Sequence, residues 1–583
     1  MDISAVYTQW ATNRYFDEDS RNELEAISDN SIEIRDRFYK ELDFGTAGIR
    51  GVLGAGTNRM NKYVVRRLST AIAAHISSKG PKAKKDGIVI GYDSRNFSSD
   101  FAKEAAAVFA GNGIKVYLHT DIVPVPVLSF SVRHLKCSAG VMITASHNPK
   151  EYNGYKVYGP DGAQLSLDDS EEISRLMNAI TDYTKVPSFS FDFFKTGNNI
   201  KYVDANIKNI FFKELKKLIA DKDSFKKNAS KLTVVYTPLH GAGAKWIPEL
   251  LKECGVNNVH CVKEQMMPDG NFPTVNVPNP EDPAAFNLAL ELAKEVNADV
   301  ILASDPDADR TGVFAKNPDG GYSLLNGNQI GVLLTERIIQ SHKTRGTMPI
   351  NPFVVSTVVS TRLTKEICEA NNVEYIDVLT GFKFIGEQIM DLDENGDKNF
   401  LFGFEESYGY LPGTYARDKD AVAGCVFMAE AAAHYVANGK TLFEALDEIY
   451  RKYSYHNEMQ VSINLKGEAG LKMIKKIMET VRGTNGKFLD EVPNYYLDIL
   501  KSELTVFDKE GNVVSVNKEY PLPSSNVLKF DYADKWFCLR PSGTEPKIKI
   551  YFGAKGENLD DAHNKVLKLK EEIIGKIMPI TQE

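Results

Sequence analysis

Three carboxylates stand at alternate positions in the segment SDPDADR. Asp305, Asp307 and Asp309 would repel one another unless a cation neutralised them, and hard oxygen ligands of this kind suit Mg²⁺. A calcium-binding EF-hand loop would need Gly and Glu at its sixth and twelfth positions, where this chain has Arg310 and Lys316. The segment therefore predicts a Mg²⁺ site, and the alternative is a solvated acidic turn.

A second segment, RPSGTEPK, combines groups that bind anions. Arg540 offers a bidentate guanidinium, Ser542 and Thr544 offer hydroxyls, and Gly543 leaves room for backbone N–H groups. Lys549 adds positive charge a few residues later. The segment predicts a phosphate-binding loop, although its spacing differs from the GxxxxGK[ST] P-loop. A plain turn is the alternative.

A third segment, ASHNP, follows an apolar run that is typical of a buried strand. Ser146 and His147 are neighbours, and their side chains would diverge in an extended chain, which argues against a Ser–His catalytic dyad. A serine delivered to a metal site and a phosphate-binding loop is expected to carry a phosphate itself. The alternative is that Ser146 only helps to form a turn.

The elements that position these residues repeat three times along the chain, in the order strand–helix–strand–helix–strand. The repeats run from the strand at 87–93 to that at 140–145, from 232–237 to 298–304, and from 353–357 to 399–404. The helices expected within them lie at about 99–112, 125–135, 245–254, 283–296, 361–371 and 384–390.

This alternation implies right-handed crossovers and mostly parallel sheets. Ligands bind beyond the carboxyl ends of the strands in such sheets. The loops expected there, after the last strand of each repeat, read ASHNPKEYNGYK, SDPDADR and EESYGY. After Tyr453 the pattern becomes mixed, with helices at about 467–480 and 559–577. The predicted fold is three similar α/β domains with mixed, mostly parallel sheets and a smaller C-terminal α+β domain.

Bulk composition limits the function classes. The chain has 583 residues, and 70 basic against 78 acidic residues give a net charge of −8, which argues against a nucleic-acid partner. Six cysteines without a CxxC pair indicate neither a zinc ribbon nor a disulfide framework. No signal peptide is evident at the N-terminus, and no apolar stretch is long enough to span a membrane. A cytoplasmic protein without a membrane partner is expected.

Together the signatures resemble those of the α-D-phosphohexomutase superfamily. ASHNP with YNGYK, DPDADR, EES and RPSGTEPK occur in the order of that family. The segments DFGTAGIRG, TGFKFIGE and GFEESYGYLPGTYARDKDA resemble its phosphoglucomutase and phosphopentomutase branch. The resemblance implies a four-domain, heart-shaped architecture with the active site at its centre. The expected boundaries are 1–204 for the phosphoserine-loop domain, 205–323 for the metal-loop domain, 324–452 for the sugar-loop domain and 453–583 for the phosphate-binding domain.

The resemblance also implies roles for single residues. Ser146 is expected to be the phosphoserine and a fourth metal ligand beside the three aspartates. Arg50, His147 and Lys156 match positions near the transferred phosphoryl group, and Lys419 matches a proposed acid/base lysine. The expected substrate-binding residues are Arg310, Thr380, Gly381, Lys383, Glu405, Ser407 and Lys419. The expected phosphate-binding residues are Arg540, Ser542, Gly543, Thr544 and Lys549.

The match has three departures from the family pattern. Pro306 and Ala308 stand where the usual DGDGDR metal loop has glycines. Neither position supplies a ligand side chain, so Mg²⁺ binding is expected to survive. Phe404 stands where many relatives have glycine before EES, which leaves the sugar preference open.

The function implied is that of a phosphoglucomutase, which interconverts glucose 1-phosphate and glucose 6-phosphate through a phosphoserine and glucose 1,6-bisphosphate. Mg²⁺ and glucose 1,6-bisphosphate, as primer and intermediate, are the implied cofactors. A phosphopentomutase is the first alternative, followed by a phosphomannomutase or a sugar-bisphosphate synthase. A metal-dependent sugar phosphatase is the alternative from another class. The expected partners are small sugar phosphates, and the chain is expected to be a monomer or a homodimer.

Overall fold

The computed structural model describes residues 2–45, 48–465, 467–542 and 547–581. The chain divides into two compact units. The first contains Met1–Ile330, Arg337–Pro352 and Phe382–Phe443, and the second contains Gly331–Glu336, Phe353–Gly381 and Glu444–Glu583.

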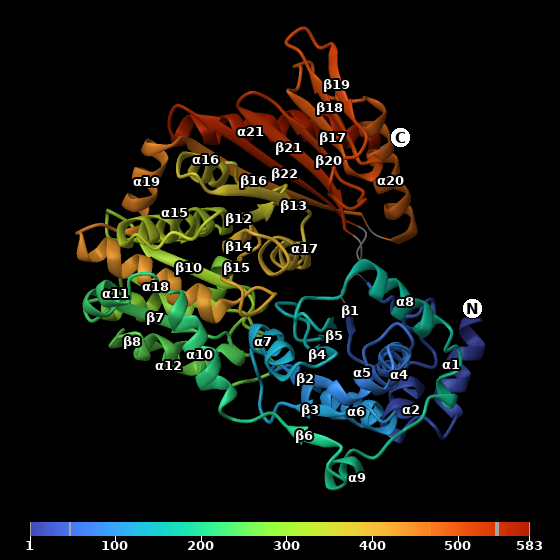
Figure 1. The fold of residues 1–583 in the computed structure, drawn as a ribbon. Coiled ribbons are helices and arrows are strands. Elements are labelled where there is room, and N and C mark those ends of the chain that lie inside the picture. Colours follow the sequence, from blue (N-terminus) through green and yellow to red (C-terminus); the bar gives the residue numbers. More distant parts are fainter. Residues whose placement is uncertain (1, 46–47, 466, 543–546, 582–583) are drawn as a thin grey trace. The chain divides into compact units, whose positions relative to one another are not determined.

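The first sheet lies in the first unit and is built from the N-terminal third of the chain (Figure 1). Its strands are ordered β1-β5-β4-β2-β3-β6. The elements are α1 (Ile3–Thr12), α2 (Glu18–Glu25), α3 (Ser31–Phe38), β1 (Gly48–Val52), α4 (Lys62–Ser78), α5 (Pro81–Asp86), β2 (Ile88–Tyr92), α6 (Ser98–Gly111), β3 (Val116–Leu118), α7 (Val125–Leu135), β4 (Ala139–Ile143), β5 (Tyr152–Tyr158), α8 (Leu167–Asn178), α9 (Phe191–Thr196) and β6 (Ile200–Tyr202).

The first strand of the repeat, β2, lies between β3 and β4. It is parallel to both, whereas β5 is antiparallel to β4 and to β1. The chain therefore crosses from one side of β2 to the other, and the strand order reverses between β2 and β4. In open α/β sheets this switch point is where ligands bind. The loop that contains Ser146 begins there.

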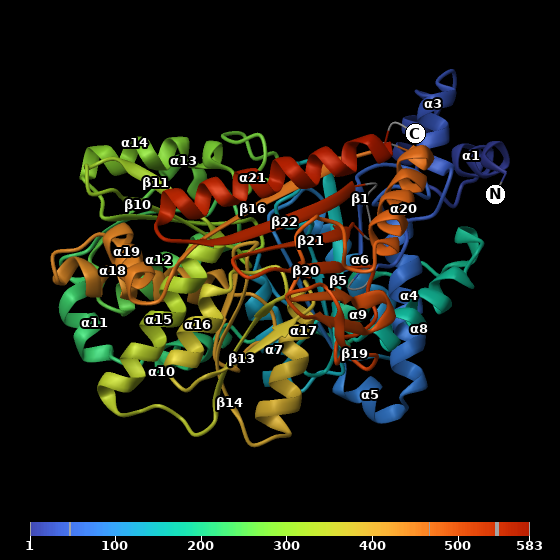
Figure 2. The same ribbon diagram turned by 90° about the horizontal axis from the view of Figure 1, so that it is seen from above.

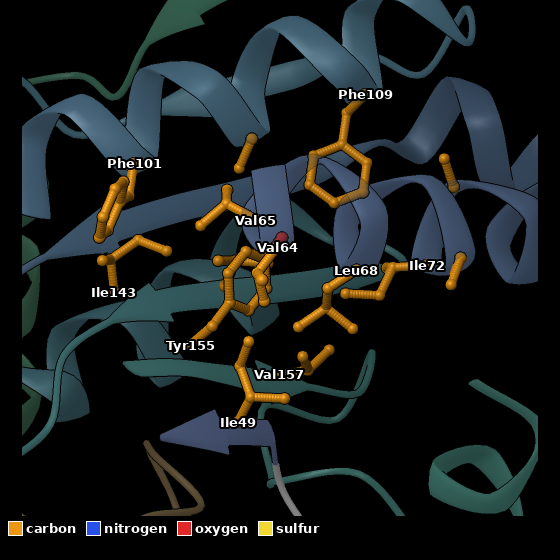
Figure 3. Close-up of a cluster of buried hydrophobic side chains, with 14 of the residues drawn as sticks. Ile49, Val64, Val65, Leu68, Ile72, Phe101, Phe109, Ile143, Tyr155 and Val157 are labelled. Carbon is orange, nitrogen blue, oxygen red and sulfur yellow. The ribbon is translucent and has the colours of Figure 1, made fainter. Parts of the chain in front are cut away.

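Hydrophobic side chains on α4 hold the helix against β5 (Figure 3). Val64 and Leu68, four residues apart on one helix face, are fully buried in one cluster with Tyr155 and Val157. Successive side chains of a strand point to opposite faces. Lys156, between Tyr155 and Val157, is therefore presented on the face away from this core.

The N-terminal helices contribute an aromatic cluster that the sequence pattern does not predict. The Trp10 ring stacks on Phe16 with 4.2 Å between centroids and meets Tyr63 edge-on at 5.4 Å. Trp10 is fully buried. This cluster ties α1 to α4 and so to the first sheet.

The second sheet repeats the arrangement of the first, in the order β11-β10-β9-β7-β8. Its first strand, β7, lies between β8 and β9 and is parallel to both, and β10 returns antiparallel to β9. The elements are α10 (Ile207–Leu218), α11 (Lys222–Ala229), β7 (Thr233–Thr237), α12 (Ile247–Glu253), β8 (Asn258–Cys261), α13 (Lys263–Met266), α14 (Asn287–Val296), β9 (Val300–Ser304), β10 (Thr311–Lys316) and β11 (Tyr322–Leu325).

The third repeat contributes to both units. β12 and β13 pair in parallel in the second unit, and β14 and β15 form an antiparallel hairpin in the first. The elements are α15 (Gly327–Arg345), β12 (Pro352–Thr357), α16 (Leu363–Ala370), β13 (Glu374–Val378), α17 (Phe382–Gln388), β14 (Asn399–Glu405), β15 (Gly409–Pro412), α18 (Ala421–Ala437) and α19 (Leu442–Lys452).

The C-terminal part of the second unit is a seven-stranded antiparallel sheet in the order β16-β22-β21-β20-β17-β18-β19. The long helix α21 lies along β16 and β22 (Figure 2). The elements are β16 (Tyr455–Asn464), α20 (Gly467–Gly483), β17 (Tyr495–Asp498), β18 (Glu503–Phe507), β19 (Val513–Asn517), β20 (Leu528–Asp531), β21 (Lys535–Pro541), β22 (Lys547–Gly556) and α21 (Leu559–Ile577).

The predicted fold class, three α/β domains with mixed, mostly parallel sheets and a C-terminal α+β domain, is confirmed. The extents expected for two loops are wrong. Tyr152–Tyr158, of which residues 152–156 are expected within the loop ASHNPKEYNGYK, forms β5, and Gly409–Pro412, partly within EESYGY, forms β15. Each of the three loops therefore joins the last strand of a repeat to an antiparallel partner, which fixes it at both ends.

Two further properties bear on the expectations from composition. All six cysteines lie within the described residues, and each is a free thiol. None of the helices in the described ranges combines the length and the hydrophobicity needed to cross a bilayer.

We predict that Leu68→Ala destabilises the first sheet by about 2–5 kcal/mol, because it leaves a cavity in the core of Figure 3. Hydrogen exchange of the α4 amides, followed by mass spectrometry, would show faster opening. Ile32→Ala is the control, since Ile32 is 81% exposed on α3 and its loss should change stability by no more than about 0.5 kcal/mol. Equal exchange in the two variants would contradict the assignment of Leu68 to the core.

Candidate functional site

The SDPDADR segment forms the turn between β9 and β10, and two helix N-termini hold it. The N–H of Val125, at the start of α7, donates to the carbonyl of Asp307 at 2.8 Å. The N–H of Ala421, at the start of α18, donates to the carbonyl of Ala308 at 3.1 Å. Helix N-termini carry partial positive charge. Both helices therefore direct that charge at an acidic loop.

The loop after β7 supports the same turn from the neighbouring strand. The N–H of Ala242 donates to the carbonyl of Pro306 at 2.8 Å. A Cβ at Gly241 would lie 2.4 Å from the Cα of Pro306, so this close approach requires glycine.

The three carboxylates of the turn converge. One oxygen from each of Asp305, Asp307 and Asp309 lies within 4.8 Å of the others, and all three side chains are buried. Across the described part of the chain, Asp307 Oδ1 and Asp309 Oδ1 are buried without a hydrogen-bond partner. Buried acceptors normally meet a donor or a cation. The cluster therefore fits a hard divalent cation such as Mg²⁺.

Two lysines from distant parts of the first unit partly neutralise the cluster. Lys156 Nζ, on β5, lies 2.8 Å from Asp307 Oδ2 and 3.0 Å from Asp309 Oδ2. Lys419 Nζ lies 3.3 Å from Asp309 Oδ2 and 3.0 Å from Asp418 Oδ1. Both lysines therefore lie beside the metal loop, and their expected roles, Lys156 near the transferred phosphoryl group and Lys419 as the acid/base group, stay predictions.

Burial and the surrounding charges shift the pKa values of Asp305 and Asp309 in opposite directions. Burial raises the pKa of Asp305 well above its ordinary value, and repulsion from Asp307 and Asp309 raises it further. Burial acts in the same direction on Asp309, but attraction to Lys156, Lys419 and Arg310 outweighs it and holds the pKa of Asp309 below its ordinary value. Of these two aspartates, Asp305 therefore binds a proton more readily than Asp309.

Arg310 extends the positive charge beyond the lysines. It forms an ion pair with Glu281, and its Nε lies 4.0 Å from Asp309 Oδ1. Burial lowers the pKa of Arg310, but Glu281 and the aspartates outweigh burial and raise it above its ordinary value. Arg310 is a permanent cation beside the carboxylates.

Ser146 follows β4, with its hydroxyl directed at the metal loop. Its Oγ donates to Asp305 Oδ2 at 2.8 Å and lies 3.2 Å from His147 Nδ1. The expectation that the side chains of Ser146 and His147 diverge is therefore wrong. Ser146 has a φ of +52°, which is left-handed and not extended, and this conformation turns the two side chains toward each other.

His147 is held neutral. Burial lowers the pKa of His147 well below its ordinary value, and Arg310 and Arg50 lower it further. One ring nitrogen of a neutral imidazole accepts a hydrogen bond. Arg50, on β1, donates to Asn148 Oδ1 at 2.7 Å and so lies against the loop that contains Ser146 and His147.

Arg95 is a residue that sequence reasoning did not place in the site. It follows β2, and Ser146 follows the neighbouring strand β4. The buried guanidinium of Arg95 donates to carbonyls of the Ser146 loop, among them that of Pro149 at 2.9 Å and that of Tyr152 at 3.1 Å. A signal was present in the sequence, because Asp93 and Arg95 put an acid and a base immediately after a buried strand.

Glu405 and Ser407 lie in the hairpin formed by β14 and β15, which belongs to the first unit. Glu405 is close enough to Lys419 for its charge to raise the pKa of that lysine, together with Asp309 and Asp418 and against the effect of burial. A Cβ at Gly409 would lie 2.1 Å from Lys419 Cδ. Glycine is therefore required for Lys419 to pass β15 and reach the aspartates.

Lys383 is a buried cation on α17. Its side chain is 4% exposed, and within the described ranges its Nζ has no hydrogen-bond partner. Burial lowers the pKa of Lys383, which Glu387 only partly offsets. The ring of Phe384 lies 4.9 Å from Nζ. An anionic ligand would supply the partner that Lys383 lacks.

The other predicted site residues belong to the second unit. Arg540 on β21 stands opposite Lys549 on β22, and the N–H of Ser542 donates to the carbonyl of Lys547 at 2.8 Å. Gly543 and Thr544 lie outside the described residues. Thr380 and Gly381 lie at the end of the 353–381 segment, and Thr380 Oγ1 is buried without a partner among the residues described.

Comparison with known proteins gives matches along most of the chain. Residues 41–184, 209–321 and 326–453 match the phosphoglucomutase/phosphomannomutase alpha/beta/alpha domains I, II and III, and residues 467–563 match the C-terminal domain of the same proteins. Two curated relatives from Staphylococcus aureus are named phosphoglucomutase. The protein of strain bovine RF122 / ET3-1 is 40% identical and that of strain USA300 is 39% identical, each over 92% of this chain and 94% of its own length.

Two solved structures share the fold. The open form of pp63/parafusin, a phosphoglucomutase from Paramecium, has a TM-score of 0.68 at 18% identity and covers 93% of this chain and 97% of its own. A phosphoglucomutase/phosphomannomutase family protein from Burkholderia thailandensis has a TM-score of 0.63 at 18% identity and covers 92% of this chain and 97% of its own. Both likenesses concern the fold alone.

We predict that Ala308→Gly leaves stability unchanged or raises it by up to about 1.6 kcal/mol. Ala308 has a φ of +51°, which costs a residue with a Cβ about 1–2 kcal/mol, and glycine removes this cost but adds about 0.4–1 kcal/mol of unfolded-state entropy. Thermal unfolding measures the change. Ala303→Gly, at a buried position of β9, is the control and should lower the melting temperature. A comparable loss in both variants would contradict strain at Ala308.

Proposed function

The chain belongs to the phosphoglucomutase/phosphomannomutase family, and from this premise we propose that it acts as a phosphoglucomutase. It interconverts glucose 1-phosphate and glucose 6-phosphate through a phosphoserine at Ser146 and glucose 1,6-bisphosphate. The observation that carries the residue assignment is the position of Ser146 Oγ, 2.8 Å from a carboxylate of the buried three-aspartate cluster. The relatives named phosphoglucomutase support the choice of reaction.

Phosphoryl transfer depends mainly on positioning and charge neutralisation. Phospho-Ser146 donates its phosphoryl group to the free hydroxyl of the bound sugar phosphate, so that the P–Oγ bond breaks and a P–O bond to the sugar forms. The bisphosphate turns over in the site and its other phosphate returns to Ser146. Added bisphosphate recharges any molecule whose Ser146 has lost its phosphate.

The aspartates and Ser146 form the proposed metal site. Asp305, Asp307 and Asp309 would hold Mg²⁺ together with an oxygen at Ser146, and the bound ion would supply neutralising charge for the transferred phosphoryl group. Lys156 and Arg310 are permanent cations that lie against different oxygens of Asp309, and we infer that they share this neutralisation. The positive ends of α7 and α18 act in the same sense.

Proton transfer is assigned to groups that already contact the cluster. A sugar hydroxyl that accepts the phosphoryl group releases a proton, and we assign Lys419 as the acid/base group, which must first lose the proton that its raised pKa retains. His147, a neutral imidazole beside Ser146, and Arg50 flank the position of the transferred phosphoryl group. Arg50 contacts the loop through Asn148, which keeps its charge near Ser146.

The second phosphate and the sugar supply binding energy that orients the reacting hydroxyl. Arg540 on β21 and Lys549 on β22 are direct partners on neighbouring strands. A phosphate bound there would offset the repulsion between their like charges. We assign Ser542, Gly543 and Thr544 to the same phosphate. Glu405 and Ser407 are assigned to sugar hydroxyls, and Thr380, Gly381 and the buried cation Lys383 are assigned to substrate binding.

Two expectations stay predictions. They are the domain boundaries at 1–204, 205–323, 324–452 and 453–583, and the monomeric or dimeric state. Phosphopentomutase, phosphomannomutase, sugar-bisphosphate synthase and phosphatase are the outcomes that would replace the proposed reaction.

We predict that glucose 1-phosphate is converted to glucose 6-phosphate much faster than ribose 1-phosphate is converted to ribose 5-phosphate. Both reactions are followed with Mg²⁺ and a trace of glucose 1,6-bisphosphate, and inorganic phosphate is measured alongside. Faster conversion of ribose 1-phosphate would favour the phosphopentomutase. Free phosphate without either isomer would favour the phosphatase.

Ser146→Ala is the matched variant for this assay. It should abolish turnover, since the group that carries the phosphate is lost, and should leave the melting temperature close to that of the wild type. Near-normal mutase activity in a folded Ser146→Ala protein would exclude the phosphoserine.

We predict that Mg²⁺ raises the melting temperature of the protein and that Asp307→Asn removes most of this rise. A ligand that binds only the folded state stabilises it by mass action, about 2.7 kcal/mol at a concentration of 100 Kd. Thermal unfolding across a Mg²⁺ titration measures this without any substrate. Asp319→Asn, at an exposed turn, is the control. An equal Mg²⁺ response in both variants would place the metal elsewhere.

A further inference from the structure

Arg95 contacts the backbone of the Ser146 loop at four carbonyls. Its Nη2 donates to the carbonyl of Ser146 at 2.5 Å and to that of Asn148, and its Nη1 donates to those of Pro149 and Tyr152 at 2.9 and 3.1 Å. The residue is 3% exposed. A buried guanidinium whose donors reach the carbonyl of the nucleophile itself fixes the loop along its whole length.

Asp93 connects this guanidinium to the metal loop. Its carboxylate lies 3.4 Å from Arg95 Nε and accepts from Thr144 Oγ1 at 2.7 Å. The same Thr144 hydroxyl oxygen accepts from the N–H of Ser146 at 2.8 Å and lies 3.1 Å from Asp307 Oδ2. The backbone of Ser146 is therefore held on its N–H side by Thr144 and on its carbonyl side by Arg95.

The contacts of Thr144 and Arg95 restrain the backbone conformation of Ser146. Ser146 adopts a φ of +52°, a conformation that persists only where surrounding contacts over-determine it. The same conformation aims Oγ at Asp305 and His147. A turn needed only for folding would not require four charge-assisted contacts on one short loop, because Asn148 and Tyr152 already donate to the carbonyls of Ala145 and Pro149.

We propose that Arg95 is a positioning residue for phosphoryl transfer, which holds Ser146 in the left-handed conformation that aligns its Oγ with the metal site. Arg95 touches neither the reacting atoms nor the sugar. It acts through the backbone of Ser146, and Asp93 orients it. The inference rests on the proposed phosphoserine chemistry at Ser146.

The test is Arg95→Lys, which keeps the positive charge and loses the planar fork that reaches several carbonyls at once. Dephosphorylated enzyme with Mg²⁺ is mixed with ³²P-labelled glucose 1,6-bisphosphate, and label on Ser146 is measured in a single turnover. The rate constant per folded molecule should fall by about 10- to 100-fold, as for a misplaced reacting group. KM for glucose 1-phosphate should stay within about threefold, because the sugar contacts are intact.

Arg337→Lys is the matched control. Arg337 is also a buried arginine that uses its fork, donating from Nε and Nη2 to Glu430, but it contacts none of the site residues described above. Its replacement should lower the melting temperature and leave the labelling rate constant unchanged. A purely structural role of Arg95 would produce the same pattern in Arg95→Lys.

Each outcome decides between these roles. An unchanged labelling rate constant in folded Arg95→Lys overturns the proposal. Failure of Arg95→Lys and Arg95→Gln to fold, where Arg337→Lys folds, also overturns it and makes Arg95 a folding residue. If the wild type takes up no label from the bisphosphate, the proposed function fails together with the inference, whereas equal uptake by wild type and Arg95→Lys removes the inference alone.

Discussion

Three carboxylates buried in one turn are the constraint on which the first unit depends. Isolated buried charges are costly, so each must meet a cation or lose its charge. The chain supplies Lys156 from β5, Arg310 from the turn itself and Lys419 from the segment before α18. The helices α7 and α18 add their N-termini. Groups from three repeats thus converge on Asp305, Asp307 and Asp309, and the turn joins the repeats.

The parallel topology explains how so many groups reach one place. In the first two repeats the first strand lies beside the last, so the loops that follow them are neighbours at the switch point. In both cases the loop after the first strand supports the loop after the last. Arg95 holds the carbonyls around Ser146, and Ala242 holds Pro306. The reactive loops are thereby fixed by elements that carry no chemistry of their own.

The order of strands and helices and the chemistry of the charged loops follow from local sequence, because apolar periodicity and side-chain type are local properties. β5 does not follow in full, since Tyr152–Lys156 pair with β1, about a hundred residues earlier, in addition to the local pairing of Tyr155–Tyr158 with β4. Arg95 reads as a local cap because its partners are main-chain carbonyls, which have no sequence signature. The hydrogen bond between Ser146 and His147 depends on a backbone angle that residue types do not reveal.

That angle recurs in all three hairpin loops. Ser146, Ala308 and Tyr408 have φ values of +52°, +51° and +66°, although each carries a Cβ. A tight connection between a strand and its antiparallel return favours a left-handed residue, for which glycine is the least strained choice. A side chain at such a position costs about 1–2 kcal/mol. At Ser146 the side chain is the proposed nucleophile, and at Tyr408 it is buried while the carbonyl accepts from the N–H of Thr311. At Ala308 the methyl group is buried and the carbonyl accepts from the N–H of Ala421, so the left-handed residue of the metal loop also presents a backbone carbonyl to a helix N-terminus.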